Sequence, residues 1–538
     1  MSGRCTGLAF AAAMAGVLAW SADDLNYVGT PVLASTGAEV LRFSGIRFAQ
    51  APVGDRRWRA PRAVADAMPD VHIDATKWPP ACVQDEGNVE WYRGVAAAFG
   101  QPADVVPSLP DVAEDCLFLN VWTPDVDGQL PVMVWIHGGA NVNGWSFEPN
   151  YRGRELAALG AVMVSIQYRL GVFGFLAHPE LSAESPNGSS GNYGILDQIE
   201  ALRWIRANIH RFGGDPGNVT VFGESAGAGD IAYLLLSPLS RRLFHRAISQ
   251  SGGWPANQRR TLAENEALGV DFLRRANAAG IDELRRLPAQ ALLAAAKEHF
   301  KRDYDDPPVD GWLLPGPPAD LLARKAFEPR PVMFGFNADE SLMYVGKPTP
   351  ERWQQALETL SNPDPVDELL GELPIPQRFD ELESATQFTC PSVTLADGFA
   401  AGGAPAYVYR FERIRAGDHG IGAYHGAEIP YVFDTHDAWL PTDMIDRELT
   451  RRMMGYWLSF AATGDPNHDN APVWPRWNDH ARVLSLAEGI RSEAFDGRLC
   501  SLIARSTDFV ARPPGLQGSL CTLRSRGRHQ AAGGQTSL

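Results

Sequence analysis

The stretch Val219-Thr220-Val221-Phe222-Gly223-Glu224-Ser225-Ala226-Gly227 decides the fold of this chain. Its last five residues match the pattern G-x-S-x-G, and its first four are apolar or β-branched, as in a buried strand. The residues that follow, 228–236 (AGDIAYLLL), can form a helix. A serine between such a strand and such a helix lies on a sharp turn that exposes its hydroxyl above the sheet. Ser225 is therefore predicted to be a nucleophile.

The segment after the strand predicted at 131–136 (PVMVWI) is the second feature of this kind. It reads His137-Gly138-Gly139-Ala140, and small residues there let the backbone approach a substrate oxygen closely. The first turn of a helix also has unpaired N–H groups and a positive dipole end. We therefore predict an oxyanion hole formed by the N–H groups of Gly139, Ala140 and Ala226.

Further apolar runs without alternation predict buried parallel strands at 161–166, 245–249, 332–336 and 406–411, and helical spacing marks 195–208. Residues 27–48 predict a small antiparallel hairpin. Strands that alternate with helices imply right-handed crossovers and a doubly wound sheet. The predicted fold class is α/β, with a large, mostly parallel sheet in one domain over residues 23–513. Helical insertions are expected at about 261–326 and 350–383.

The two ends of the chain differ from this pattern. Residues 1–22 predict a secretory signal peptide, because a short basic start precedes an apolar run too short to span a bilayer comfortably. Residues 514–538 are rich in Arg, Gly and Ser and predict a disordered tail. We expect a secreted or periplasmic protein with no stable membrane association.

The amino-acid composition restricts the classes of partner that the protein can bind. Of 538 residues, 45% are hydrophobic and 21% charged, as in an ordinary globular protein. The net charge of −16 repels phosphate backbones and disfavours nucleic-acid binding. One of the six cysteines, Cys5, lies in the signal, so the other five can form at most two disulfides. No cysteine spacing resembles a metal site, and we expect neither metal nor organic cofactor.

A serine nucleophile needs a histidine base and a carboxylate that orients it. In the order typical of this fold class, the acid and then the histidine follow the serine. His425 and His419 both lie in Gly-containing loops, and Asp339 and Glu340 both follow the strand predicted at 332–336. The residues alone leave both choices open.

In many ordered segments the chain resembles the type B carboxylesterase/lipase family, which includes cholinesterases and bacterial p-nitrobenzyl esterases. The matching segments are Phe43–Ile46, Ala51–Gly54, Glu114–Val121, Tyr168–Gly171, Gly174–Phe175, Gly191–Asn192, Asp197–Gln198, Phe212–Pro216, Gly223–Gly227, Asn337–Glu340 and His425–Glu428. The resemblance implies that Glu340 is the acid and His425 the base. It also implies that Glu224 is a buried carboxylate near the site and not the orienting acid.

The same resemblance implies two disulfides, Cys82–Cys116 and Cys390–Cys500, and leaves Cys521 over. In the loop-entropy model they would contribute about 3–4 and 4–5 kcal/mol.

Several positions depart from the family pattern. Ala140 replaces the third glycine, and Asn141 stands where an aromatic residue is usual, which predicts a more polar acyl side of the pocket. Asp230 stands where serine is common, and Trp254 falls where many members line the acyl pocket. Trp91 lies between Cys82 and Cys116 in an unfamiliar context, so cholinesterase activity is not expected.

The predicted function is hydrolysis of a small-molecule carboxylic ester through an acyl-enzyme at Ser225. An amidase, thioesterase or lipase would use the same three residues, and these alternatives stay open. A non-catalytic cholinesterase-like binding protein is disfavoured because all three positions are filled.

Overall fold

The computed structural model describes residues 27–64, 73–300, 307–436, 438–469, 471–477 and 481–506. The predicted signal at 1–22 and the predicted tail at 514–538 lie outside these residues, as do Cys5 and Cys521.

A mixed sheet dominates the described residues. Its eleven strands follow the order β15-β14-β13-β12-β11-β10-β8-β9-β7-β3-β2. The bounds are β2 (Thr30–Leu33), β3 (Glu39–Arg47), β7 (Phe118–Thr123), β8 (Leu130–Ile136), β9 (Val162–Ile166), β10 (Gly214–Glu224), β11 (Arg246–Gln250), β12 (Val332–Asn337), β13 (Ala406–Phe411), β14 (Arg482–Leu486) and β15 (Arg491–Ala494). In the sheet order between β9 and β14, which includes β8, all neighbouring strands are parallel. The neighbouring strands at both edges of the sheet are antiparallel. The large, mostly parallel sheet predicted from the sequence is confirmed.

Two short pairs stand apart from this sheet. They are β1 (Tyr27–Val28) with β4 (Ile73–Asp74), and β5 (Ala81–Cys82) with β6 (Val112–Ala113).

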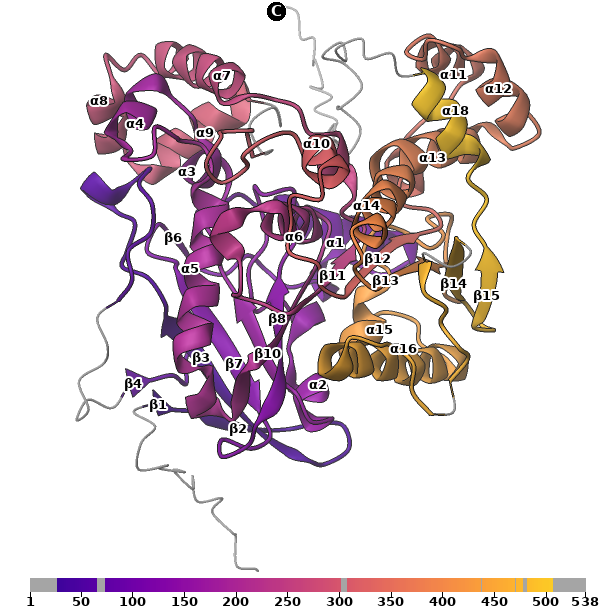
Figure 1. Cartoon of the computed structure of the whole chain (residues 1–538), viewed down its shortest axis with the longest axis horizontal. Helices are drawn as coiled ribbons and strands as arrows, with labels where there is room; N and C mark the ends of the chain where they lie inside the picture. Colours follow the sequence, from indigo (N-terminus) through magenta and orange to yellow (C-terminus); the bar gives the residue numbers. More distant parts are fainter. Residues whose placement is uncertain are drawn as a thin grey trace, which may run out of the picture.

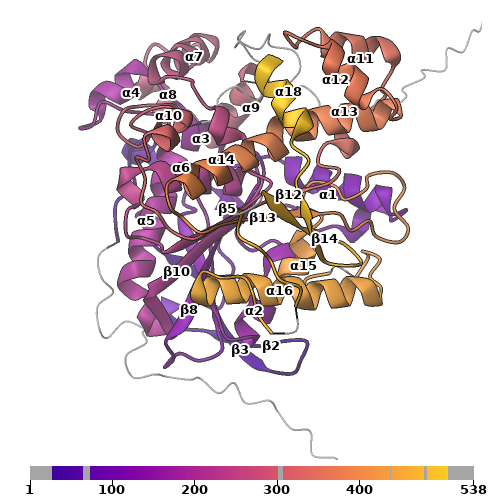
Figure 2. The ribbon, with the colours of Figure 1, turned by 45° about the vertical axis from the view of Figure 1, so that its right-hand side comes forward.

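The apolar runs do not alternate because both faces of the sheet are covered. In β8, Val132 and Val134 belong to one buried cluster, and Met133 and Trp135 belong to another. Figure 2 shows α5 (Tyr193–Asn208), α6 (Ala226–Leu236) and α14 (Cys390–Ala401) on one face and α2 (Arg154–Ala158) and α16 (Met444–Thr463) on the other. A strand between two helical layers buries successive side chains in opposite directions.

Two groups of helices stand at the top of Figure 1. One comprises α7 (Leu262–Arg275), α8 (Ile281–Arg286), α9 (Ala289–His299) and α10 (Pro318–Ala323). The other comprises α11 (Pro350–Leu357), α12 (Asp364–Leu370), α13 (Ile375–Ser384) and α18 (Arg498–Ser506). All of them except α18 fall in the stretches where the sequence predicts helical insertions; α18 comes from near the C-terminal end of the described residues. The other α-helices among the described residues are α1 (Gly87–Ala98), α3 (Gly171–Phe175), α4 (Pro179–Glu184) and α15 (Ile429–Phe433). Among the helices described, none combines the length and apolarity of a membrane span.

Strand order fixes where the predicted site residues gather. β8 pairs with β10, and β12 pairs with β13, all in parallel. Parallel strands end at the same edge of a sheet, and loops at that edge commonly form the site of an open α/β fold. A parallel bridge between Asp339 and Tyr424 also brings together the loops after β12 and β13. The candidate acid and base therefore lie side by side.

Candidate active site

Ser225 occupies a strained turn between β10 and α6. Its backbone angles are φ 53° and ψ −125°, a region that non-glycine residues rarely adopt. The turn is held by a hydrogen bond from Ser225 N to Gln250 O at 2.9 Å. A Cβ at Gly227 would lie 2.0 Å from Ile136 O, so only glycine lets α6 pack this closely on β8. The strand, turn and helix predicted around Ser225 are present.

The loop that follows β8 runs beside this turn. We call residues 137–144 the oxyanion loop. A Cβ at Gly138 would lie 3.0 Å from Ser225 Cβ, and Gly139, Ala140 and Asn141 all have positive φ. Among the residues that the structure describes, no hydrogen bond uses the N–H of Gly139 or Ala140. Ala226 is the first residue of α6, where an N–H has no acceptor within the helix. Three predicted donors are thus available around the serine.

The carboxylate of Glu340 binds the candidate base. His425 Nδ1 lies 2.6 Å from Glu340 Oε2, although the two residues are 85 positions apart. Glu340 is fully buried, and its Oε1 accepts a hydrogen bond from Asn337 N at 2.7 Å. A buried carboxylate bound to Nδ1 fixes the ring orientation and leaves Nε2 for the substrate side.

The rival residues have other partners. Asp339 Oδ2 accepts a hydrogen bond from Ala423 N at 2.7 Å and thereby braces the loop that carries His425. His419 is exposed, and its backbone N donates to Ala98 O. Of the alternatives that the sequence leaves open, the geometry favours Glu340 and His425.

The second imidazole nitrogen faces Glu224. His425 Nε2 lies 3.3 Å from Glu224 Oε1, and Glu224 is the residue that precedes the candidate nucleophile. Within the described residues, no hydrogen bond joins Ser225 Oγ to His425. Catalytic hydrogen bonds are often long in free enzymes and shorten when substrate binds. Glu224 is buried beside the imidazole, a contact that the sequence does not predict.

A third buried carboxylate, Glu428, completes the surroundings of the imidazole. Its oxygens accept hydrogen bonds from Gln250 Nε2 at 3.0 Å and Asn337 Nδ2 at 2.7 Å. Burial raises the pKa of Glu428 and raises that of Glu224 to about 8. Burial alone would lower the pKa of His425, but the nearby charges of Glu224, Glu340 and Glu428 outweigh it and raise that pKa above its usual value. The protonation of this half of the site is therefore set by buried charge.

Aromatic side chains flank the imidazole. The Phe388 ring lies 4.9 Å from the His425 ring, and Trp254 meets Phe388 edge-on at 6.0 Å. Trp91, from α1, donates from Nε1 to Tyr344 Oη at 2.8 Å. A Cβ at Gly426 would lie 3.5 Å from the Trp91 ring, so this tryptophan borders the loop of His425. The sequence pointed to Trp254 but gave no local signal for Phe388, which lies in a π-helical turn at Ala385–Thr389.

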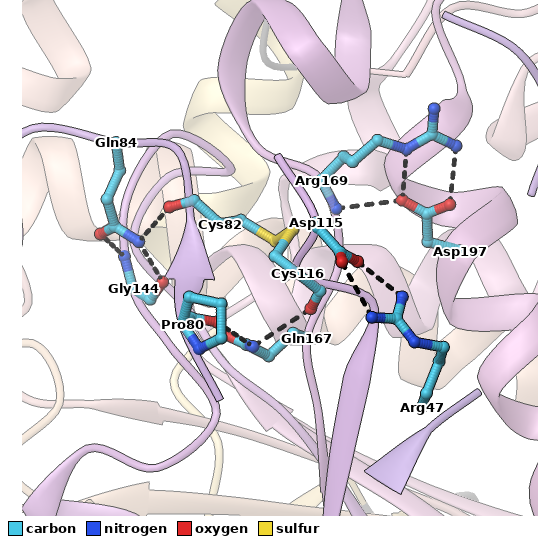
Figure 3. Close-up of a disulfide and its surroundings, with 10 residues drawn as sticks. All are labelled: Arg47, Pro80, Cys82, Gln84, Asp115, Cys116, Gly144, Gln167, Arg169 and Asp197. Carbon is cyan, nitrogen blue, oxygen red and sulfur yellow. Dashed lines mark hydrogen bonds and ion pairs between the residues drawn. A yellow bond between two sulfur atoms is a disulfide. The ribbon is translucent and has the colours of Figure 1, made fainter. Parts of the chain in front are cut away.

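Both disulfides implied by the family resemblance are present. Cys82 bonds to Cys116, and Cys390 bonds to Cys500. The first closes the segment that carries α1. Figure 3 shows beside it Gln84, whose amide exchanges two hydrogen bonds with Gly144 at 2.7 and 2.8 Å. The disulfide-closed segment is thus attached directly to the oxyanion loop.

Asn141 and Asp230 pair with one another. Asn141 Nδ2 donates to Asp230 Oδ1 at 3.1 Å, and Asp230 is fully buried. This bond gives the polar side chain of Asn141 a partner within the protein. The more polar acyl side of the pocket stays a prediction. The described residues contain no group of three or more His, Cys, Asp or Glu arranged to hold a metal ion.

The central parallel sheet, the strained serine turn and the loops at the strand ends define an α/β-hydrolase. The comparisons with known proteins narrow this class. The model of the carboxylesterase family matches residues 28–374 and 373–496. Fumonisin B1 esterase of Sphingopyxis macrogoltabida is 35% identical over 495 residues, which cover 84% of each chain. Para-nitrobenzyl esterase of Bacillus subtilis is 34% identical over 486 residues, covering 85% of this chain and 93% of that esterase.

Solved structures give the same result. A PNB esterase superposes with a TM-score of 0.76 at 31% identity, covering 89% of this chain and 97% of the other. The chain belongs to the carboxylesterase family and is a carboxylic ester hydrolase.

Proposed function

We propose that this enzyme hydrolyses esters by acyl transfer through Ser225, with His425 as general base and Glu340 as the acid that orients it. The observation that carries the assignment is the Glu340–His425 hydrogen bond beside the strained turn of Ser225. The family makes small-molecule esters the substrate class, and the substrate itself is not fixed by these residues.

The first half of the reaction forms the acyl-enzyme. Ser225 Oγ attacks the ester carbonyl carbon while His425 Nε2 takes the hydroxyl proton. The carbonyl oxygen becomes an oxyanion that accepts hydrogen bonds from Gly139, Ala140 and Ala226. When the intermediate collapses, the bond to the alcohol oxygen breaks and His425 returns the proton to the leaving alcohol.

The second half regenerates the enzyme. Water gives a proton to His425 and attacks the acyl carbon, and the acid product leaves as Ser225 regains its proton. The Glu340 carboxylate stabilises the imidazolium in both halves.

Hydrolysis of p-nitrophenyl acetate, butyrate and octanoate tests this assignment. We expect Ser225→Ala to lose activity by roughly 10⁴-fold or more while remaining folded. Ser361→Ala is the matched control, because Ser361 is exposed and distant in sequence from every site residue. Equal activity of Ser225→Ala and the control would overturn the assignment. The chain-length profile also distinguishes a short-chain esterase from a lipase.

The location of the enzyme is a second proposal. The two disulfides and the signal predicted at 1–22 both favour an oxidising compartment outside the cytoplasm. Sequencing the N-terminus of the exported protein tests this, and we expect it to start near residue 20 or 23.

A further inference from the structure

Three buried polar side chains connect helix α5 to the oxyanion loop. Gln198, from α5, donates from Nε2 to Asp230 Oδ2. The other oxygen of Asp230 accepts the hydrogen bond from Asn141 Nδ2. Asn141 is 5% exposed, and Gln198 and Asp230 are not exposed at all. A buried hydrogen-bonded series of this kind fixes the relative position of the elements it joins.

The loop needs such a constraint because its backbone is strained. Ala140 and Asn141 have φ of 55° and 57°, which residues with a side chain adopt at a cost that is larger for Ala than for Asn. Two such residues in succession persist only where their surroundings hold them. Asn141 is held on both sides, since its backbone O accepts from Gly171 N at 2.7 Å and its side chain binds Asp230.

The bond also spans the two sides of the oxyanion hole. Asp230 lies four residues after Ala226 in α6, so both are on the same face of that helix. Asn141 directly follows Ala140 in the loop. The Asn141–Asp230 bond therefore sets how far the Ala140 N–H lies from the Ala226 N–H, the spacing that a shared oxyanion requires.

Helix α5 supplies the fixed point. Asp197, the neighbour of Gln198, binds Arg169 in a buried two-bond ion pair with both distances 2.7 Å (Figure 3). Gln198 thus extends from an anchored turn of helix, and its amide binds the Asp230 oxygen that does not bind Asn141.

We propose that Asp230 and Gln198 act through Asn141 as positioning residues that hold the oxyanion loop in its active shape. This inference deepens the proposed function and rests on it. It assigns a role to two residues that depart from the family pattern, Asn141 and Asp230. Neither side chain is required to touch the substrate.

The test exchanges the two partners. Assayed at alkaline pH, where both carboxyl groups are ionised and cannot share a proton, Asn141→Asp places a carboxylate against the Asp230 carboxylate and breaks the bond. The double variant Asn141→Asp/Asp230→Asn restores it in reverse, because the new amide can donate to position 141 and accept from Gln198. Asn187→Asp is the matched control, since Asn187 is exposed and the charge change is the same.

We expect Asn141→Asp to lower kcat for p-nitrophenyl butyrate roughly 10- to 100-fold with little change in KM. A trifluoromethyl ketone, which forms an oxyanion on the serine, should bind more weakly by a similar factor. The double variant should regain most of both losses, and the control should match the wild type. A role in folding alone would lower the amount of folded enzyme and leave kcat per titrated active site unchanged.

Hydrogen exchange in a peptide covering 137–146 gives a readout that does not depend on activity. We expect faster exchange in Asn141→Asp and recovery in the double variant. Should Asn141→Asp fail to fold, Asn141→Ser replaces it, with the same expected loss of kcat. Wild-type kcat and exchange in the single variant, or no recovery in a folded double variant, would overturn the inference. A wild type that neither hydrolyses the esters nor binds the trifluoromethyl ketone would overturn the proposed function. Hydrogen exchange would still show whether the Asn141–Asp230 bond orders the loop.

Discussion

Different forces stabilise the two halves of the proposed active site. The serine half, formed by the turn at Ser225 and the oxyanion loop, depends on close backbone packing and hydrogen bonds from side-chain amides. The histidine half depends on buried charge, with Glu224, Glu340 and Glu428 around His425. Added volume should therefore damage the first half, and altered charge or pH should damage the second.

Replacing Glu340, the proposed orienting acid, should have the largest effect. Glu340→Gln keeps the shape of the side chain but removes the charge that stabilises the imidazolium. We expect kcat to fall on the order of 10⁴-fold, measured with p-nitrophenyl butyrate. Asp339→Asn is the control, because Asp339 only braces the loop, and its loss should be much smaller. The reverse order of the two losses would show that the acid is misassigned.

A larger side chain at the Ser225 turn should cause the second-largest loss of activity. In Gly227→Ala the new Cβ would lie 2.0 Å from Ile136 O, so α6 must move away from β8. We expect roughly a 100-fold loss of kcat/KM together with a lower melting temperature. Gly489→Ala is the control, since a Cβ there meets nothing within 4 Å. Full activity in Gly227→Ala would show that packing does not govern this half.

Charge removal beside the imidazole should shift the pH profile. Glu224 raises the pKa of His425, so Glu224→Gln should lower it. The base would then lose its proton at a lower pH, and the acidic limb of kcat/KM should move to lower pH. Glu358→Gln, at an exposed carboxylate, should leave the limb in place. An upward shift in Glu224→Gln would contradict the electrostatic account.

Removing the two disulfides should affect stability and activity differently. Their half-cystines are 34 and 110 residues apart, which corresponds to about 4 kcal/mol for Cys82–Cys116 and about 5 kcal/mol for Cys390–Cys500. Replacing both cysteines of either pair by serine should lower the free energy of unfolding. The decrease should be larger for Cys390–Cys500 than for Cys82–Cys116. Only the Cys82–Cys116 disulfide closes the segment whose Gln84 binds Gly144. We therefore expect a several-fold loss of kcat when this disulfide is removed. Denaturant unfolding and kcat, measured together, test this ordering.

The sequence predicts the serine half of the site better than the histidine half. The turn at Ser225 and the oxyanion loop are local features, because the glycines that permit close packing lie next to the residues they position. The sequence alone did not separate Glu340 from Asp339 or His425 from His419. That choice depends on which loops meet at the sheet edge, and the family resemblance was needed to make it.

The roles of other residues in the site depend on partners that are distant in sequence. Gln250 and Gln198 are polar residues inside a strand and a helix, and their roles appear only once partners distant in sequence are brought together. Asn141 and Asp230 depart from the family pattern at separate positions, and nothing in the sequence predicts the hydrogen bond that joins the loop to α6.

Covalent labelling with a p-nitrophenyl phosphonate tests the central claim most directly. The serine oxygen would displace p-nitrophenolate from phosphorus, and mass spectrometry would locate the adduct. We predict one adduct per chain, on the peptide that contains Ser225, and a rate at least about 10³-fold slower in His425→Ala. Labelling at another serine, or a rate that does not depend on His425, would contradict the account.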